Sequence, residues 1–252
     1  MFILPWMRLM RRYCLDQTFE RWAFEQLELP PRAHILELGA NTGQFWYENR
    51  ERIPTGWEIE VTDTDPVVLD IARKHLRRLR PRVTVGKLDI FRLPQRPERY
   101  DAVVCNHMFH LMPYQERAFV LDNIWRYLVP GGVMVAGTCA EQDLEELRAQ
   151  FLDLDPELDI FDEDKTPFFS IERGDRVLEP CFNDIKVRKY VARLEITDAD
   201  VLVDGVRQAS RSIREHLVND ASREFRDYFA RLIECCGPLR TTRQAGLFIC
   251  RK

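Results

Sequence analysis

The sequence has no long hydrophobic run and no metal-binding cysteine motif, and each absence excludes a class of protein. The longest apolar runs, such as residues 133–136, are far shorter than the ~20 residues that cross a bilayer, so no membrane span is expected. The seven cysteines include no Cys-x-x-Cys pair and no Cys/His cluster with metal-ligand spacing. We expect no bound metal, and free thiols in a reducing compartment. The adjacent Cys235 and Cys236 are expected to be buried, and we assign them no function.

An overall positive charge is also missing. The 252 residues include 41 Asp and Glu against 37 Lys and Arg, a net charge of −4, and 45% of the chain is hydrophobic. This composition excludes a disordered or fibrous protein. It disfavours nucleic acid as the main partner, because phosphate binding needs a positive face. The apolar residues 2–7 precede Arg8, Arg11 and Arg12, the reverse of a secretory signal, so we expect a cytoplasmic protein.

Short apolar segments alternate with amphipathic ones from residue 33 onward, which is typical of a parallel sheet with crossover helices. We therefore predict an α/β fold, a doubly wound, Rossmann-like and mostly parallel seven-stranded sheet with helices on both faces and an amino-terminal helical lid. The predicted strands are residues 34–38, 57–62, 83–88, 101–105, 133–137, 185–190 and 247–250. Beyond residue 140, helices are predicted over residues 141–152, 198–213 and 221–235.

We find no repeat or clear linker, and we interpret residues 1–252 as a single domain. Its parts are a helical lid (1–30), a cofactor-binding core (31–138), an acceptor-side cap (139–184) and the completion of the sheet (185–252). Six of the ten residues from 73 to 82 are basic. In a doubly wound sheet this segment lies opposite the carboxyl ends of the strands, so we interpret it as a solvated surface.

The most informative segment is a predicted strand that ends in a loop of small residues, Gly39-Ala40-Asn41-Thr42-Gly43, ahead of a helix. Such a loop lets a ligand approach the backbone at the carboxyl end of a strand. It is not the dinucleotide fingerprint, because Asn41 and Gln44 stand where the second and third glycines would admit a pyrophosphate. A cofactor without phosphates fits better.

Three carboxylates follow successive predicted strand ends. Asp63 ends the second strand, where an acid can accept both hydroxyls of a ribose. Glu37 and Asp89 occupy comparable places on the first and third strands. The three acids together indicate a cationic ligand that carries adenosine.

These residues resemble the successive motifs of class I S-adenosylmethionine-dependent methyltransferases over residues 33–138. The motifs are Glu37-x-Gly39-x-x-x-Gly43, Asp63 ahead of Pro66, Leu88-Asp89 with Leu93-Pro94, residues 100–108, and Leu128-Val129-Pro130-Gly131-Gly132. More narrowly, Gly43-Gln44-Phe45-Trp46, Asn106-His107-Met108 and segments near residues 194–198 and 246–248 are similar to a bacterial branch of small methyltransferases.

The resemblance implies S-adenosyl-L-methionine as cofactor and S-adenosyl-L-homocysteine as product. It implies that Glu37 faces the methionine end and that Asp63 holds the ribose. The other implied cofactor contacts are Gly39, Ala40, Asn41 and Gly43 beneath the cofactor, Thr64 and Leu88-Asp89-Ile90 at the adenine, and Asn106 with His107 near the transferred methyl. Asn41 stands where the family commonly has a glycine.

Methyl transfer from a sulfonium is an in-line displacement, so alignment matters more than catalytic side chains. The candidates for a base are His107, His110 and, from the predicted lid, Tyr13. We expect a small-molecule acceptor, in a pocket roofed by the amino-terminal helices and by Phe161, Phe168, Phe169 and Phe182. The alternatives are an RNA or protein methyltransferase and a catalytically inactive S-adenosylmethionine-binding protein. Whether two copies associate is left open.

Overall fold

The computed structural model describes residues 4–79, 81–94, 97–160, 169–209 and 211–252. Contacts within the chain divide it into two compact units. The first, called here the sheet unit, comprises Phe19–Glu141, Phe168–Tyr190 and Ala245–Lys252. The second, called the helical unit, comprises Met1–Thr18, Gln142–Pro167 and Val191–Gln244. Each unit has its own hydrophobic core.

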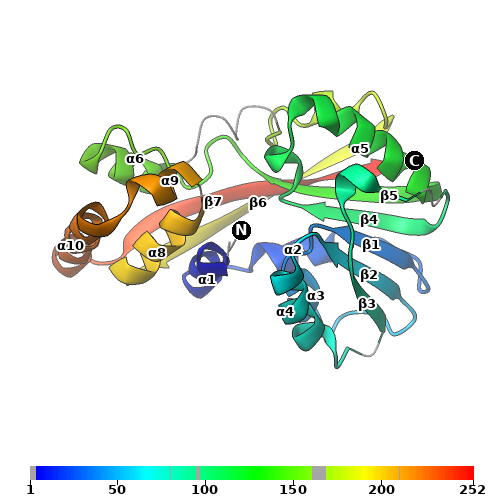
Figure 1. Cartoon of the computed structure of the whole chain (residues 1–252), viewed down its shortest axis with the longest axis horizontal. Coiled ribbons are helices and arrows are strands. Elements are labelled where there is room, and N and C mark those ends of the chain that lie inside the picture. Colours follow the sequence, from blue (N-terminus) through cyan, green and yellow to red (C-terminus); the bar gives the residue numbers. More distant parts are fainter. Residues whose placement is uncertain (1–3, 80, 95–96, 161–168, 210) are drawn as a thin grey trace. The chain divides into compact units, whose positions relative to one another are not determined.

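The strands form one seven-stranded sheet in the order β3-β2-β1-β4-β5-β7-β6 (Figure 1). The pairs β1·β2, β2·β3, β1·β4 and β4·β5 are parallel, and β7 runs antiparallel to β5. The strands are β1 (His34–Leu38), β2 (Glu58–Asp63), β3 (Arg82–Lys87), β4 (Tyr100–Asn106), β5 (Leu128–Cys139), β6 (Asp184–Ile196) and β7 (Leu239–Arg251). The predicted mostly parallel seven-stranded sheet is confirmed.

The last two strands are much longer than predicted, at 13 residues each. In β6 the first six residues are exposed or half-buried, and burial alternates only from Tyr190 onward. In β7 the segment before Leu247 mixes Arg and Thr with apolar residues. The prediction for β6 covered only residues 185–190 and missed residues 191–196, where buried and exposed residues alternate. Neither this end of β6 nor the start of β7 has the continuous apolar character of a strand buried on both faces, so the sequence pattern showed only a part of each strand.

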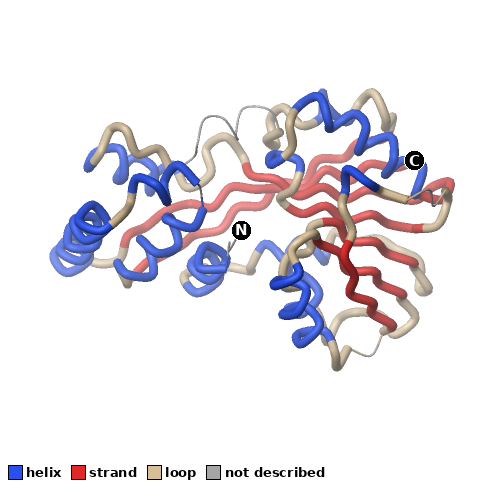
Figure 2. Tube along the Cα trace, in the orientation of Figure 1, coloured by secondary structure: helices blue, strands red, loops and turns tan. Residues whose placement is uncertain are grey.

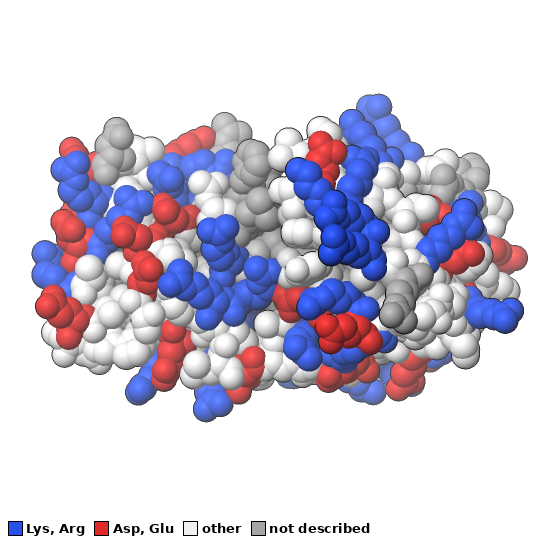
Figure 3. Space-filling view, turned by 90° about the horizontal axis from the view of Figure 1, so that it is seen from below, with Lys and Arg blue, Asp and Glu red and all other residues white. Residues whose placement is uncertain are grey.

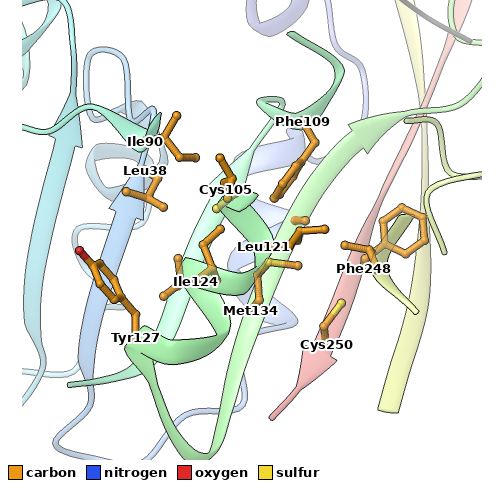
Figure 4. Close-up of a cluster of buried hydrophobic side chains, with 14 of the residues drawn as sticks. Leu38, Ile90, Cys105, Phe109, Leu121, Ile124, Tyr127, Met134, Phe248 and Cys250 are labelled. Atoms are coloured by element: carbon orange, nitrogen blue, oxygen red, sulfur yellow. The ribbon is translucent and has the colours of Figure 1, made fainter. Parts of the chain in front are cut away.

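Helices pack in two groups within the sheet unit (Figure 2). In one group α3 packs against α2 and α4, and in the other α5 packs against α7 and η1. The helices are α2 (Phe19–Glu25), α3 (Gln44–Glu48), α4 (Pro66–Leu76), α5 (Tyr114–Tyr127) and α7 (Asp175–Leu178), with the 3₁₀ turns η1 (Ile90–Arg92) and η2 (Phe109–Leu111). Figure 4 shows α5 over the sheet, with Leu121 and Ile124 meeting Met134 of β5 in the core. This packing fixes the strand ends that carry the site.

The helical unit contains α1 (Leu4–Arg12), α6 (Glu145–Leu154), α8 (Ala199–Ala209), α9 (Arg211–His216), α10 (Asn219–Cys236) and the ends of β6 and β7. Leu9 of α1 packs against Gly205 of α8, where a Cβ would lie 2.9 Å from Leu9 Cδ2. Phe151 of α6 stacks on Phe225 of α10 at 5.4 Å between ring centroids. The helix predicted over residues 198–213 corresponds to α8 and α9, and residue 210 between them lies outside the described residues. The subdivision into lid, core, cap and completion stays a prediction.

On the face shown in Figure 3, Lys and Arg side chains gather in several groups, with Asp and Glu side chains beside them. Within the basic cluster of residues 73–82, Arg73 pairs with Asp70 at 2.6 Å and Arg82 with Glu58 at 3.7 Å, while Arg80 lies outside the described residues. No helix among the described residues is long and apolar enough to cross a membrane. In the same part of the chain, no three His, Cys, Asp or Glu side chains converge as metal ligands.

Candidate cofactor and acceptor site

The loop after β1 is built from left-handed residues. Gly39, Asn41 and Gly43 have φ values of 70°, 51° and 69°. The Ala40 N–H donates to the Thr62 carbonyl at 2.9 Å, which ties the loop to β2. A Cβ on Gly39 would collide with Met108 Sδ, and one on Gly43 would lie 2.8 Å from Leu76 Cδ1. A Cβ at either position would therefore strain the backbone and displace the Met108 or Leu76 side chain.

The Asp63 carboxylate organises this loop. Its Oδ2 accepts the Asn41 N–H at 2.8 Å, and its Oδ1 accepts the N–H groups of Thr64 at 2.7 Å and Asp65 at 3.0 Å. A carboxylate offers about four acceptor sites, and three are occupied. One ribose hydroxyl can therefore bind without loss of a loop bond. The expectation that Asp63 accepts both hydroxyls requires that one backbone N–H be released.

Glu37 lies inside the sheet unit, with 2% of its surface exposed. Its Oε2 accepts a hydrogen bond from Trp46 Nε1 at 2.7 Å. Burial raises the pKa of Glu37 to about 8, although the Trp46 hydrogen bond acts in the opposite direction. Burial therefore favours the neutral, protonated form of Glu37.

The predicted adenine contacts lie beside Asp63. The Leu88 N–H donates to the Asp63 carbonyl at 3.1 Å, which brings the end of β3 to the end of β2. Asp89 caps η1 by accepting the Phe91 N–H at 3.0 Å. Ile90 is buried and Thr64 is exposed. Thr64, Leu88 and Asp89 thus lie together at the neighbouring ends of β2 and β3. Their role as adenine contacts stays a prediction.

Two buried side-chain oxygens at the site have no hydrogen-bond partner among the described residues: Oδ1 of Asn41 and Oδ1 of Asn106. A buried acceptor without a donor costs about 1–3 kcal/mol, so a ligand that brings donors would be stabilised there. S-adenosylmethionine carries such donors in its ammonium, its ribose hydroxyls and its adenine amino group. The residues present therefore fit this cofactor.

His107 sits at the end of β4 in a strained conformation, with φ of 52°. Its N–H donates to the Gly137 carbonyl at 2.8 Å, and its ring packs on Phe19 at 4.7 Å between centroids. Its Nδ1 lies 3.7 Å from Cys139 Sγ at the end of β5. The His110 ring, on η2, lies 6.2 Å from the His107 ring. Left-handed backbone costs a non-glycine residue about 1–2 kcal/mol, so packing around His107 must hold it there.

Other predicted acceptor-side residues are placed differently. Phe169 and Phe182 lie in the core of the sheet unit, 1% and 2% exposed, so the expectation that they roof a pocket is wrong. Their apolar size suits a core as well as a pocket, which is why the sequence could not separate the two. Phe161 and Phe168 lie outside the described residues. Tyr13 is buried in the core of the helical unit, and no described residue bonds its hydroxyl.

Three side chains contact the site without an assigned role from sequence: Trp46, Met108 and Phe19. Trp46 follows the loop by about one helical turn and reaches back to Glu37. Met108 fills the space above Gly39, and Phe19 lies against both His107 and Gly137. Of these three contacts, only that of Trp46 could have been predicted from the local sequence, by its spacing from Gly43. The Met108 and Phe19 contacts depend on tertiary packing.

Residues 35–132 match a family model described as a methyltransferase domain. The chain is 32% identical over 115 residues to a demethylmenaquinone methyltransferase of Deinococcus radiodurans, a match that covers 45% of each protein. It is 26% identical over 107 residues to a carboxy-S-adenosyl-L-methionine synthase of Hydrogenovibrio crunogenus, covering 42% of each. The chain thus spans under half the length of the curated relatives it matches.

The fold has solved counterparts as well. The YcgJ protein of Bacillus subtilis superimposes with a TM-score of 0.61 at 15% identity, over 92% of this chain and 97% of that one. Residues 35–132 therefore belong to the methyltransferase domain family, and the predicted class I S-adenosylmethionine-dependent methyltransferase domain is confirmed. S-adenosylmethionine is the methyl donor of that class, which confirms the predicted cofactor.

Proposed function

We propose that this chain transfers the methyl group of S-adenosylmethionine to a small-molecule acceptor by in-line displacement, leaving S-adenosylhomocysteine. The observation that carries the proposal is the Gly39–Gly43 loop, tied to Asp63 where β1 and β2 end. Its tight, glycine-lined curve and the half-buried Asp63 carboxylate suit a ribose hydroxyl rather than a pyrophosphate.

The bound cofactor supplies an electrophilic methyl group on a good neutral leaving group, so the chain has mainly to hold and align two molecules. Gly39, Ala40, Asn41 and Gly43 form the floor of the cofactor site, and Asp63 orients the ribose. The Asn106 amide, next to the strained His107, accepts a donor from the methionine end. These groups fix the direction from which an acceptor can approach.

A base is needed only where the acceptor must lose a proton. We assign this role to His107, because its backbone is fixed by Gly137 and its ring by Phe19. A general base of this kind accelerates a reaction by about 10²–10⁴-fold. His110 is the candidate of second rank, through its ring contact with His107. Tyr13 belongs to the helical unit, and its role as a base stays a prediction from the sequence.

A small acceptor is favoured over a macromolecule by two observations. The curated relative from Deinococcus radiodurans is named for a small-molecule reaction, on demethylmenaquinone. In addition, at least two arginines of the basic cluster 73–82 are paired with carboxylates, which weakens the case for a phosphate-binding face. A catalytically inactive protein that binds the cofactor would share the same loop, so turnover separates it from our proposal.

Calorimetry with S-adenosylmethionine, S-adenosylhomocysteine and NAD is the direct test. We expect binding of the first two and none of NAD. Measurable NAD affinity with none for S-adenosylmethionine would reverse the assignment. Incubation with labelled cofactor and fractionated small metabolites, against total RNA and protein at two salt concentrations, then identifies the acceptor class. Label found only in RNA or protein would contradict the small-molecule proposal.

A further inference from the structure

The adjacent cysteines near the carboxyl end of the chain do not lie as the sequence suggested. Cys235 and Cys236, the last residues of α10, are both exposed, whereas burial was expected. Their Sγ atoms lie only 2.9 Å apart, at hydrogen-bond contact, and either thiol can donate. Neighbouring side chains on a helix normally diverge by about 100°, because 3.6 residues complete a turn. The two thiols are therefore turned toward each other.

The end of α10 holds the two thiols at the protein surface. Gly237 follows directly with φ of 84°, and its N–H donates to the Ile233 carbonyl at 3.0 Å, so the last helical turn stays closed behind the pair. The Cys235 thiol is also directed at the Leu232 carbonyl, at 3.5 Å. A Cβ built on Gly237 meets nothing within 4 Å, so the surface beside the pair is open. Because both cysteines are exposed, a reagent can reach the pair.

A disulfide between these residues would be strained. Disulfides have an S–S length of about 2.05 Å and usually join Cα atoms ~4.4–6.8 Å apart. Consecutive Cα atoms are only ~3.8 Å apart, so the bond would form at the cost of backbone geometry and would be reduced easily. A third atom bridging the two sulfurs relaxes this constraint, because the sulfurs then need not approach bonding distance.

The surroundings limit what that bridging atom can be. Structural zinc takes four ligands, but no group of three or more His, Cys, Asp or Glu side chains within the described ranges could hold a metal. The pair is thus a two-sulfur site. It suits a thiophilic centre that needs only two thiolates, and soft thiolate ligands select soft partners.

We propose that Cys235 and Cys236 form a surface dithiol site that chelates trivalent arsenicals. With an organic arsenic(III) oxide, both S–H bonds break and two As–S bonds form, the two protons leave with the oxide oxygen as one water molecule, and arsenic keeps its oxidation state. The site belongs to the helical unit and is independent of the proposed methyl transfer.

Phenylarsine oxide is a suitable probe, with the full folded chain and intact-mass spectrometry as the readout. We expect one adduct per chain, heavier than the protein by the reagent minus one water. It should be removed by a small dithiol such as 2,3-dimercaptopropanol and should resist the same thiol concentration of glutathione. Cys235→Ser and Cys236→Ser should each reduce occupancy at least tenfold at equimolar reagent. Cys14→Ser, which changes a half-buried thiol elsewhere in the same unit, should leave the occupancy unchanged.

Both substituted positions are exposed, so the serine variants are expected to fold, and circular dichroism verifies this. An adduct that persists in both variants, or that glutathione removes as readily as the dithiol does, would overturn the proposal. So would a wild-type chain that forms no adduct with equimolar reagent after prior reduction. Because S-adenosylmethionine binding is measured separately, a failure here and a failure of the proposed methyl transfer are distinguishable.

Discussion

The two halves of the candidate site, on the same edge of the sheet, are held by different forces. Where β1 and β2 end, the Asp63 carboxylate accepts three backbone N–H groups, and Gly39 and Gly43 stand where an added Cβ would meet a neighbouring side chain. Where β4 and β5 end, a strained His107 is held mainly by ring packing on Phe19 and one backbone bond to Gly137. The cofactor half is thus preorganised by charge-assisted hydrogen bonds, and the acceptor half by packing that a few substitutions could remodel.

The largest effect is expected at Gly39. Gly39→Ala adds left-handed strain of about 1–2 kcal/mol and a Cβ that collides with Met108. We expect S-adenosylmethionine affinity to fall more than a hundredfold in calorimetry. Gly131→Ala is the matched control, because Gly131 also has positive φ, 78°, but a Cβ there meets nothing within 4 Å. Equal losses of affinity in the two variants would mean that general destabilisation, and not the shape of the loop, lowers the affinity.

On the acceptor side we expect a loss of turnover rather than of cofactor binding. If the acceptor must lose a proton, His107→Ala should lower turnover by about a hundredfold and remove a titration near pH 6–7 from the rate profile. Phe19→Leu keeps the imidazole but removes its ring contact, so it should lower the rate less and keep the profile shape. Less than fivefold loss in His107→Ala, with an unchanged pH profile, would identify His107 as a wall residue.

The same contrast explains what the sequence could predict. The cofactor half could be predicted from short local motifs, since Glu37 and Asp63 lie near the ends of β1 and β2, and Gly39 and Gly43 stand in the loop directly after β1. The acceptor half depends on contacts between distant segments. Nothing near His107 in the sequence signals its left-handed φ or the approach of Phe19.

The errors elsewhere have the same origin. Phe169 was expected to roof a pocket, but it lies in the core against Phe109 and Phe248. The prediction failed because an aromatic residue in a connecting segment suits a pocket and a core equally well. The thiols of Cys235 and Cys236 were expected to be buried and are exposed. In both cases side-chain burial is set by tertiary packing, which residue type alone does not encode.

A smaller effect is expected at Asp63. Asp63→Ala removes a charge-assisted bond to the ribose, of a kind worth about 1.5–3 kcal/mol, and also frees three loop N–H groups. Cofactor affinity should fall at least tenfold. Asp65→Ala is the neighbouring control: it removes the N-cap bond to the Val67 N–H and should cost about 1 kcal/mol of stability without loss of affinity. The opposite pattern would make Asp65 the ribose ligand.

The smallest effect on affinity, but a clear one on stability, is expected at Glu37. The folded chain holds the Glu37 proton up to a pKa of about 8, whereas the unfolded chain loses it near 4.5. Between these values the folded state binds more protons than the unfolded state. The stabilisation that comes from the bound Glu37 proton is therefore complete below about pH 4.5 and is lost as the pH rises through 8. The slope cannot exceed about 1.4 kcal/mol per pH unit.

Glu37→Gln keeps the size of the side chain and a hydrogen-bond acceptor for Trp46 Nε1 while removing the titration. Urea unfolding from pH 5 to 9 should show the variant gaining stability relative to the wild type as pH rises, with cofactor affinity changed less than about threefold. Trp46→Phe is the complementary change: the lost N–H bond should raise the Glu37 pKa further and extend the sloping region to higher pH. Parallel stability curves for Glu37→Gln and the wild type would mean that Glu37 is ionised in the folded chain. In that case the contrast between Glu37, as a neutral buried acid, and Asp63, as the acid that binds the loop, would be wrong.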